Sequence, residues 1–445
     1  MLSRLAGPLA AIAERWVPSA FSIAVLLTAV IVAAALALTD ATATAVLGAW
    51  GDGFWTLSPF AMQMALVVLT GSLVATAPVV DRLFARVAAR AGSPVRAATL
   101  MATVSMALAW VHWGLSLVGS AMLVRHVARA QPRVDYRLLV TCAYLGMGTT
   151  WHAGLSGSVP LLMATPGHFL ERTTGLLPLS ATTFSAFNLA LVVVVTAVML
   201  LVVPRLHPPP AQVVPPPAVV LTASTVAGPD EAGTSGPAGW VDRSRAITLV
   251  LGLAGAAWLA RRALQPGPFL TLDVLNFTFL MLAVLLHPHV ASLVAAGDAG
   301  ARLLSGVVLQ FPLYAGMYGV IEGTGLARVL GEAIARTATP ATLPLLLYWY
   351  SSVLNYFVPS GGSKWAVEAP FLIDAASRLG VGLDRAVLAY SWGDMASNLI
   401  QPFWALPLLA AAGLGFRDIM GYATVCFLVI SCVVSAAFWL LPHLG

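Results

Sequence analysis

Long apolar runs without a charged residue recur along this chain and limit the folds that it can adopt. The clearest are residues 17–39 and 182–204. Each can cross about 30 Å of hydrocarbon as a helix, which takes about 20 residues. Because the runs are continuous and unpaired backbone groups are costly in lipid, we predict helices and not barrel strands. Only 9% of the residues are charged, against about 25% in soluble domains. We therefore expect an all-α polytopic membrane protein.

The arginines lie mostly between the apolar runs and indicate topology. Two clusters lie between these two runs, one over residues 82–96, after the second predicted span, and one over residues 125–137. The positive-inside rule places both clusters and the N-terminus in the cytoplasm. The arginines of the second half do not fit this arrangement equally well. Because the net charge of +5 is spread between spans, we predict contact with the lipid bilayer and no binding of nucleic acid.

Two apolar segments contain polar interruptions that predict re-entrant hairpins. The first interruption, residues 110–116, lies between the two arginine clusters, so its segment must enter and return on one side. The second contains Pro359 and the Gly361-Gly362 pair, which disfavour a continuous helix. A hairpin tip is tolerated in a membrane only where it is buried in protein or lines a water-filled cavity. Each tip is therefore a candidate site.

The two halves of the chain resemble each other weakly. Each hairpin is followed by an Ala-Tyr pair, Ala143-Tyr144 or Ala389-Tyr390, and then by Pro-Leu-Leu at nearly the same distance. We predict two inverted repeats, 1–204 and 245–445, each with a re-entrant helical hairpin and a broken transmembrane helix, and roughly nine to eleven spans in all. The Pro/Gly-rich stretch 205–244 cannot build a packed core and is interpreted as a cytoplasmic linker.

The hairpin of the second half is the first candidate binding segment. A half-helix that begins there presents free N–H groups and a positive dipole end to an anion such as a carboxylate. Lys364, the single lysine of the chain, is costly at membrane depth unless it is paired or hydrated. It contacts the substrate, pairs with Glu368 at i+4, or snorkels to the interface. The residues assigned to this part of the substrate site are Ser360, Gly361, Gly362, Ser363 and Lys364.

The remaining candidates lie on the two broken helices and the first hairpin. Asp394, Ser397, Asn398 and Gln401 form one polar stripe at helical spacing. Asp394 binds a coupling cation or proton, or is a buried packing carboxylate. The small residues of the first half either allow close packing or line the site. His112 and His152 are proton carriers or hydrogen-bonded fillers. The assigned substrate residues are Trp113, Gly114, Ser116, Ser156, Gly157 and Ser158; the residues assigned to ion coupling or to completing the site are His112, Asn355, Asp394, Asn398 and Gln401.

Several motifs in register resemble the bacterial short-chain fatty acid transporter family. They include Trp50-Gly-Asp-Gly-Phe-Trp55, Val358-Pro-Ser-Gly-Gly362, Gln401-Pro-Phe-Trp-Ala-Leu-Pro407 and Arg417-Asp-Ile-Met-Gly421. The resemblance implies an inner-membrane permease for short monocarboxylates such as acetoacetate and butyrate, of the ion transporter superfamily. It further implies coupling to Na⁺ or H⁺, no cofactor, and a homodimer. Lys364 departs from the neutral residue or histidine expected there, and His112 from an expected amide.

Two other functions fit parts of the sequence. A sodium-coupled dicarboxylate carrier would use Lys364 for a second carboxylate. An intramembrane serine hydrolase would use Ser156 in Gly154-Leu-Ser-Gly157, but it needs a histidine base on another element, and His152 is too close along the chain. A continuous channel suits two broken-helix hairpins less well than alternating access does. The sequence therefore predicts a secondary active transporter and not an enzyme.

Overall fold

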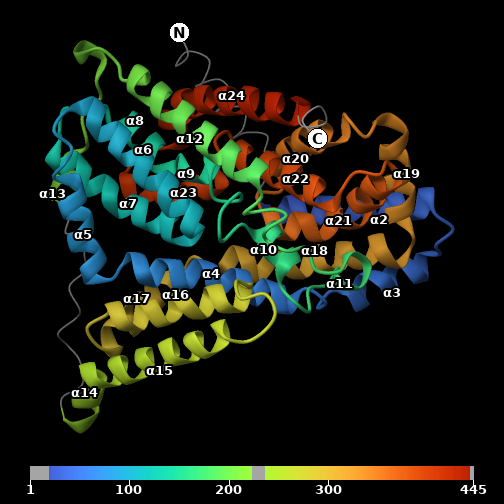
Figure 1. Ribbon diagram of the computed structural model, residues 1–445, viewed down its shortest axis with the longest axis horizontal. Coiled ribbons are helices and arrows are strands. Elements are labelled where there is room, and N and C mark those ends of the chain that lie inside the picture. The colour runs from blue at the N-terminus through green and yellow to red at the C-terminus, as the bar shows by residue number, and fades with distance from the viewer. Residues whose placement is uncertain (1–19, 223–235, 441–445) are drawn as a thin grey trace.

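The computed structural model describes residues 20–222 and 236–440, and within these ranges the protein is helical and has no strand (Figure 1). Six helices are long and apolar enough to span a membrane: α2 (Ala20–Leu38), α4 (Ser58–Ala75), α6 (Pro94–Val111), α12 (Ala186–Leu206), α15 (Arg245–Ala263) and α24 (Phe416–Leu440). The pair α17 (Val290–Ala301) and α18 (Ser305–Gly323), bent by 52°, would make a seventh. This confirms the all-α polytopic membrane class. The expected count of roughly nine to eleven spans stays a prediction, since six or seven helices meet these criteria in the described ranges.

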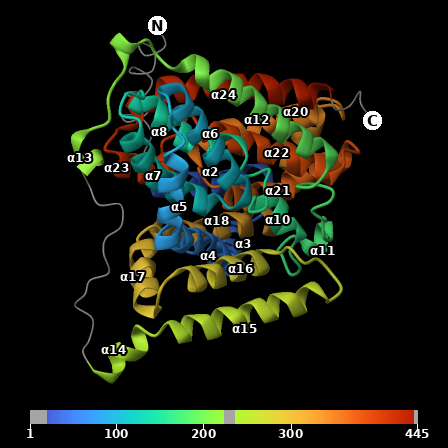
Figure 2. The same ribbon diagram turned by 60° about the vertical axis from the view of Figure 1, so that its left-hand side comes forward.

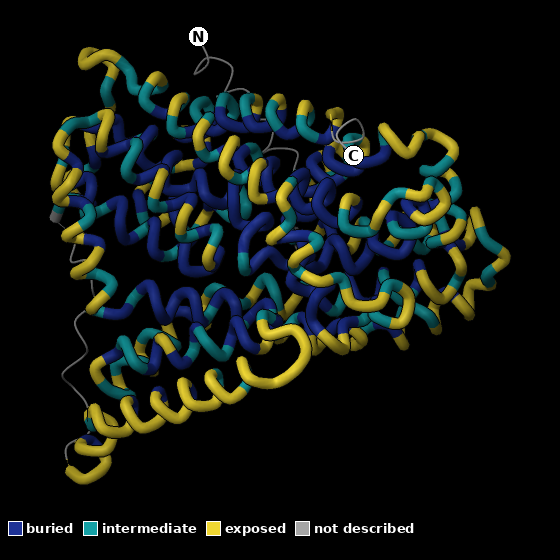
Figure 3. Tube along the Cα trace, in the orientation of Figure 1, coloured by how far each residue is buried: buried dark blue, intermediate teal, exposed yellow. Residues whose placement is uncertain are grey.

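The most buried helices lie in the middle of the molecule. In Figures 1 and 2, α12 and α24 run along one side and α15 is the outermost helix on the other. Between them, α8 (Tyr136–Tyr144) is buried at every residue except Arg137, and α22 (Leu383–Ser397) is buried from Ala386 onward. Figure 3 shows α15 as a largely exposed helix. Since its exposed residues include Val250, Leu253 and Trp258, this helix presents an apolar face suited to lipid.

Both predicted interruptions are breaks in the structure. α6 ends at Val111, His112 is extended (φ −159°), and α7 (Trp113–Ala130) packs back against α6. In the second half, α20 (Leu343–Phe357) and α21 (Gly361–Arg378) are separated by residues 358–360, with Ser360 extended (φ −154°). Pro359 at this break cannot donate a backbone hydrogen bond. The inverted orientation of the two hairpins stays a prediction.

The helices that follow each hairpin are also interrupted. In the first half α8 leads into α9 (Gly146–Thr149), an irregular segment and α10 (Ser158–Ala164). In the second half α22 ends at Ser397 and the chain resumes as η2 (Phe403–Ala405) and α23 (Leu406–Ala412). The remaining elements are α3 (Ala43–Gly53), α5 (Pro78–Ala88), α11 (Glu171–Thr174), α16 (Leu272–Leu286) and α19 (Leu326–Thr337).

The described parts of the 205–244 segment hold η1 (Pro210–Gln212), α13 (Ala218–Thr222) and α14 (Pro237–Asp242). Its first part is fixed by hydrogen bonds to the last turn of α7 and to the residue before α8. The Val214 N–H donates to Asp135 Oδ2 (3.0 Å), and Arg129 Nε donates to the Leu221 carbonyl (3.0 Å). On either side of this segment the two halves interleave, because α4 packs against α16, α17 and α18. The boundaries at 204 and 245 therefore divide the sequence, but the helices on the two sides pack together.

Candidate functional site

A cluster of ionisable side chains lies buried where α21 meets α22. Lys364 Nζ is 3.1 Å from Asp394 Oδ1, and His152 Nδ1 is 2.9 Å from Asp394 Oδ2. All three side chains are at most 1% exposed. His152 comes from the irregular segment before α10, so the cluster joins the two halves of the chain. Because one carboxylate cannot offset a charged lysine and a charged histidine together, the cluster suits a neutral imidazole that donates from Nδ1.

Lys364 is held by more than one partner. Its Nζ donates to the Ser351 carbonyl (2.8 Å) and contacts the Ser351 hydroxyl (3.0 Å), and it lies 4.8 Å from the centre of the Tyr390 ring. The snorkelling interpretation is therefore wrong, because the ammonium lies in the interior. Among the described residues, its ion-pair partner is Asp394 and not Glu368. Glu368, one turn further along α21, is 3% exposed.

Gly361, the first residue of α21, is packed directly against this cluster. A Cβ atom on Gly361 would lie 2.6 Å from Asp394 Oδ2 and 2.6 Å from His152 Cε1. On Gly362 it would lie 2.5 Å from Phe60 Cζ. Such close approach of the backbone is available to glycine alone. The helix tip and the ionisable cluster are thus in contact.

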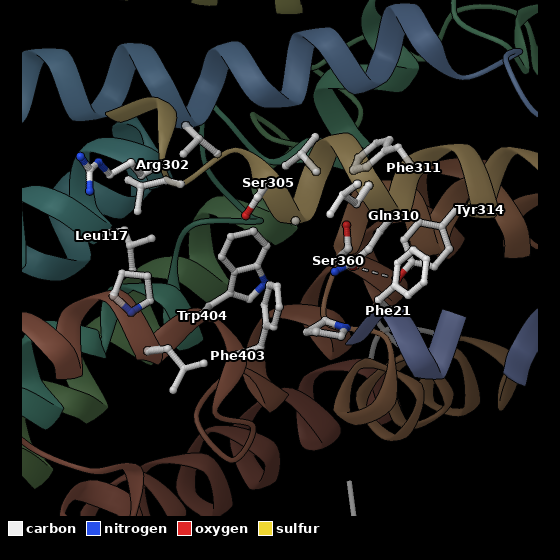
Figure 4. Close-up of a pocket in the computed structure, with 18 residues that line it drawn as sticks. Phe21, Leu117, Arg302, Ser305, Gln310, Phe311, Tyr314, Ser360, Phe403 and Trp404 are labelled. Atoms are coloured by element: carbon white, nitrogen blue, oxygen red, sulfur yellow. Dashed lines mark hydrogen bonds between the residues drawn. The ribbon is translucent and has the colours of Figure 1, made fainter. Parts of the chain in front are cut away.

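The other side of the tip opens into two adjoining cavities. The smaller, about 30 Å³, is lined by Trp113, Trp151, Ser158, Gly361 and Gly362 among others. The larger, about 430 Å³, shares Ser360 and several apolar residues with it. Figure 4 shows the larger cavity with the aromatic side chains of Phe311, Phe403 and Trp404 around it and Arg302 at the end away from Ser360.

Hydrogen-bond donors converge on this tip. The first intrahelical bond of α21 runs from the Lys364 N–H to the Ser360 carbonyl (2.9 Å). The amides of Gly361, Gly362 and Ser363 precede it and are free of the helical ladder. The indole N–H groups of Trp113 and Trp151 are buried, and neither has a hydrogen-bond partner in the described part of the chain. The smaller cavity is thus lined by residues that carry backbone, hydroxyl and indole donors.

The polar residues at and after the end of α22 form hydrogen bonds that stabilise the break in that helix. Asn355 Nδ2 on α20 donates to the Asp394 carbonyl (2.8 Å), the Ser397 hydroxyl (3.0 Å) and Asn398 Oδ1 (2.9 Å). Asn398 Nδ2 in turn donates to the Met147 carbonyl (3.0 Å), and Gln401 Nε2 donates to Asn398 Oδ1 (3.1 Å). These amides satisfy backbone and side-chain groups that a broken helix would otherwise leave unpaired.

The predicted residues of the first half divide into two groups. Trp113 and Ser158 line the smaller cavity. The others support the backbone around it: the Ser156 hydroxyl accepts from the Trp113 N–H (2.9 Å), the Ser116 hydroxyl donates to the Ser105 carbonyl (3.0 Å), and Gly114 and Gly157 lie against backbone atoms. His112 caps α7, where its Nδ1 accepts from the Leu115 N–H (3.2 Å), and its ring lies 3.9 Å from that of Phe279.

Three residues of the site were missing from the predicted set: His152, Trp151 and Ser351. His152 was considered as a proton carrier. The Gly/Ser-rich stretch that follows it is the sequence signal that could have placed it among the predicted site residues. Its contact with Asp394 joins residues 242 positions apart. Ser351 contributes a carbonyl, which any residue has, so its role had no sequence signal.

Broken helices that meet around a buried ionisable cluster and a cavity are typical of membrane transporters. The sequence profile of the family described as short chain fatty acid transporter matches residues 1–441. The chain belongs to this family. It is therefore a multi-pass membrane transporter and not an enzyme, which removes the hydrolase alternative.

Relatives and solved structures agree with this assignment. A protein of Escherichia coli K12, provisionally named a short-chain fatty acid transporter, is 38% identical over 96% of this chain and 97% of its own. A similarly named protein of Haemophilus influenzae is 33% identical over 95% and 96%. The YdaH transporter of Alcanivorax borkumensis aligns with a TM-score of 0.60 at 18% identity, covering 94% of this chain and 98% of its own. MtrF of Neisseria gonorrhoeae, from a class of antimetabolite efflux pumps, aligns with a TM-score of 0.62 at 14% identity. This alignment covers 96% of this chain and 95% of MtrF. At these identities the structures establish the fold alone.

Proposed function

We propose that this protein is a secondary active carrier of short-chain monocarboxylates in the bacterial cytoplasmic membrane, with its N-terminus in the cytoplasm, and that the substrate carboxylate binds at the tip of α21. The observation that carries the proposal is the set of donors around the smaller cavity. Gly361 and Gly362, whose amides are free of the helical ladder, line the same cavity as Trp113 and Trp151, whose indole N–H groups have no hydrogen-bond partner among the described residues. A helix N-terminus also favours an anion through its dipole.

The larger cavity supplies a place for a short acyl chain. It adjoins the tip at Ser360, and its walls include Val307, Phe311 and Phe403. Apolar walls with a few convergent polar groups are typical of sites for small organic ligands. Lys364 is engaged by Asp394 and Ser351, so it is not available for a second carboxylate. This favours monocarboxylates over the dicarboxylate alternative.

Accumulation of an anion needs coupling to a cation gradient, and the proposal includes symport with H⁺ or Na⁺. The Lys364–Asp394–His152 cluster supports this part, because it lies against Gly361 at the same tip. Ionisable groups buried at membrane depth are costly and mark ion or proton pathways.

The test is uptake of labelled butyrate, acetoacetate and succinate into proteoliposomes that hold the purified protein. Saturable uptake of the monocarboxylates, driven by an imposed ion gradient, is the expected result. The double variant Ser158→Ala and Ser360→Ala should raise KM about fivefold per hydroxyl with kcat little changed, since one hydrogen bond contributes about 1 kcal/mol. Ser377→Ala, at the exposed far end of α21, is the matched control. Uptake of succinate alone, or an unchanged KM in the double variant, would refute the proposed site.

A further inference from the structure

The surroundings of the Lys364 ammonium resemble a site for a free monovalent cation. Its Nζ has three oxygen neighbours: the Ser351 carbonyl at 2.8 Å, the Ser351 hydroxyl at 3.0 Å and Asp394 Oδ1 at 3.1 Å. Ser351 lies on α20 and Asp394 on α22, so two elements other than its own supply them. Carbonyl, hydroxyl and carboxylate oxygens are the ligands that hard cations take in proteins. In transporters such oxygens, next to interrupted helices, bind the coupling ion.

We infer that the Lys364 ammonium permanently occupies the position of a coupling sodium ion, so that this carrier works without sodium. This inference rests on the proposed function, which it deepens by naming the ion that the site does not need. The ammonium carries the same unit charge as Na⁺ and offsets the Asp394 carboxylate in the same way. Because it is tethered to α21, it cannot exchange with solution.

The second oxygen of Asp394 is also engaged. Asp394 Oδ2 accepts from His152 Nδ1 at 2.9 Å, so both carboxylate oxygens face nitrogen donors. A sodium ion bound to Asp394 would have to displace one of them. With the chain supplying the cation, the ion exchanged with solution is the proton.

The His152 imidazole and the Glu368 carboxylate are the groups beside the cluster that can accept that proton. The titratable groups packed around Lys364 and Asp394 are His152, Glu368 on α21 and Tyr390 on α22, and Tyr350 on α20 lies beside Glu368. Lys364, Glu368 and Tyr350 also line a cavity of about 190 Å³ on the side of α21 where Leu27 and Ile31 of α2 lie. The cluster therefore lies between this cavity and the one at the α21 tip, which Ser158 lines.

The decisive variant is Lys364→Ala, which removes the ammonium and leaves its three oxygens in place. Wild-type uptake of labelled butyrate should be the same in sodium and in choline salts at equal pH and membrane potential. Uptake by K364A in choline should fall at least about tenfold, because Asp394 is left buried without a counter-charge. Sodium should restore it. Lys364→Met, which fills the space without a charge, and the double variant K364A/D394N, which lacks the carboxylate ligand, should not respond to sodium.

A binding measurement tests the inference without reference to the transported substrate. Sodium chloride should raise the thermal unfolding midpoint of purified K364A above its value in choline chloride, because a ligand that binds the folded state stabilises it. The wild type should show no such difference, nor should Arg336→Ala, which removes a charge from an exposed ion pair. K364A would show this stabilisation by sodium even if the protein did not transport butyrate. The experiment therefore distinguishes failure of the proposed substrate from failure of this inference.

Several results would overturn the inference. One is sodium-dependent uptake or stabilisation of the wild type. Another is full activity of K364A in choline, which would mean that the ammonium has no role. A K364A protein that gains neither uptake nor stability from sodium, or that folds in neither salt, also counts against it, because bound sodium should replace the missing charge.

Discussion

Replacing Gly361 with alanine tests whether the α21 tip and the ionisable cluster are in mechanical contact. The added Cβ would lie 2.6 Å from Asp394 Oδ2 and 2.6 Å from His152 Cε1. Carbon contacts are normally about 3.5–4.0 Å, so the methyl group overlaps two buried groups by about 1 Å. Neither can turn away freely. Asp394 is held by Lys364, and His152 stacks on Trp151 with ring centres 4.2 Å apart.

The expected cost follows from overpacking of a filled interior. Such insertions lower the free energy of unfolding by about 1–3 kcal/mol. To relieve the overlap here, Asp394 must separate from His152 or α21 must shift toward the cavity. We expect Gly361→Ala to lower the thermal unfolding midpoint and to reduce the initial uptake rate by more than its loss of stability explains. Both quantities are measured on the same purified protein, by thermal unfolding in detergent and by proteoliposome uptake.

The matched control is Gly297→Ala on α17, where an added Cβ meets nothing within 4 Å. An alanine in a helix interior should be more stable than glycine by about 0.5–1 kcal/mol. The two substitutions are chemically identical, so they separate the effect of the site from that of helix propensity. A G361A protein with the midpoint and uptake of the wild type would refute the reasoning, because it would mean that the cluster is not packed against the tip.

Two further predictions concern the donors and the helix break. Trp113→Phe and Trp151→Phe each remove a buried indole N–H from a residue that lines the smaller cavity. The proposed contact with the carboxylate predicts that each change raises the KM for butyrate about fivefold, since one hydrogen bond contributes about 1 kcal/mol. An unchanged concentration dependence of uptake would exclude this contact. Asn355→Leu removes the two N–H donors that three oxygen atoms share at the end of α22 and should lower the free energy of unfolding by about 2 kcal/mol. A thermal midpoint equal to that of the wild type would contradict this.

The helix breaks could be predicted because their causes are local. Pro359 removes a backbone donor, and Gly361 and Gly362 weaken any helix that runs through them. The first tip was predicted from the arginines on both of its sides. At both places the chain breaks within or beside the predicted residues.

The partner of Lys364 could not be predicted, because it depends on how distant helices pack. Glu368 at i+4 satisfies the rule for pairs on a helix surface, and it is the partner that the sequence favours. That rule fails here because Lys364 lies on a face that α20 and α22 cover, where Ser351 and Asp394 approach more closely. His152 was similarly hidden, since its contact with Asp394 spans the two halves.

Lys364 lies one turn from the tip of α21 and so connects the proposed substrate site with the proposed cation site. Gly361 and Gly362 line the smaller cavity, and Lys364 on the same helix reaches back to Ser351 and Asp394. A buried ion pair of this kind adds little net stability compared with apolar packing, so stability alone does not account for it. Any movement of α21 that admits or releases a carboxylate at its first turn also moves the ammonium relative to its three oxygens. The two sites therefore cannot change independently, which is the property that coupled transport requires.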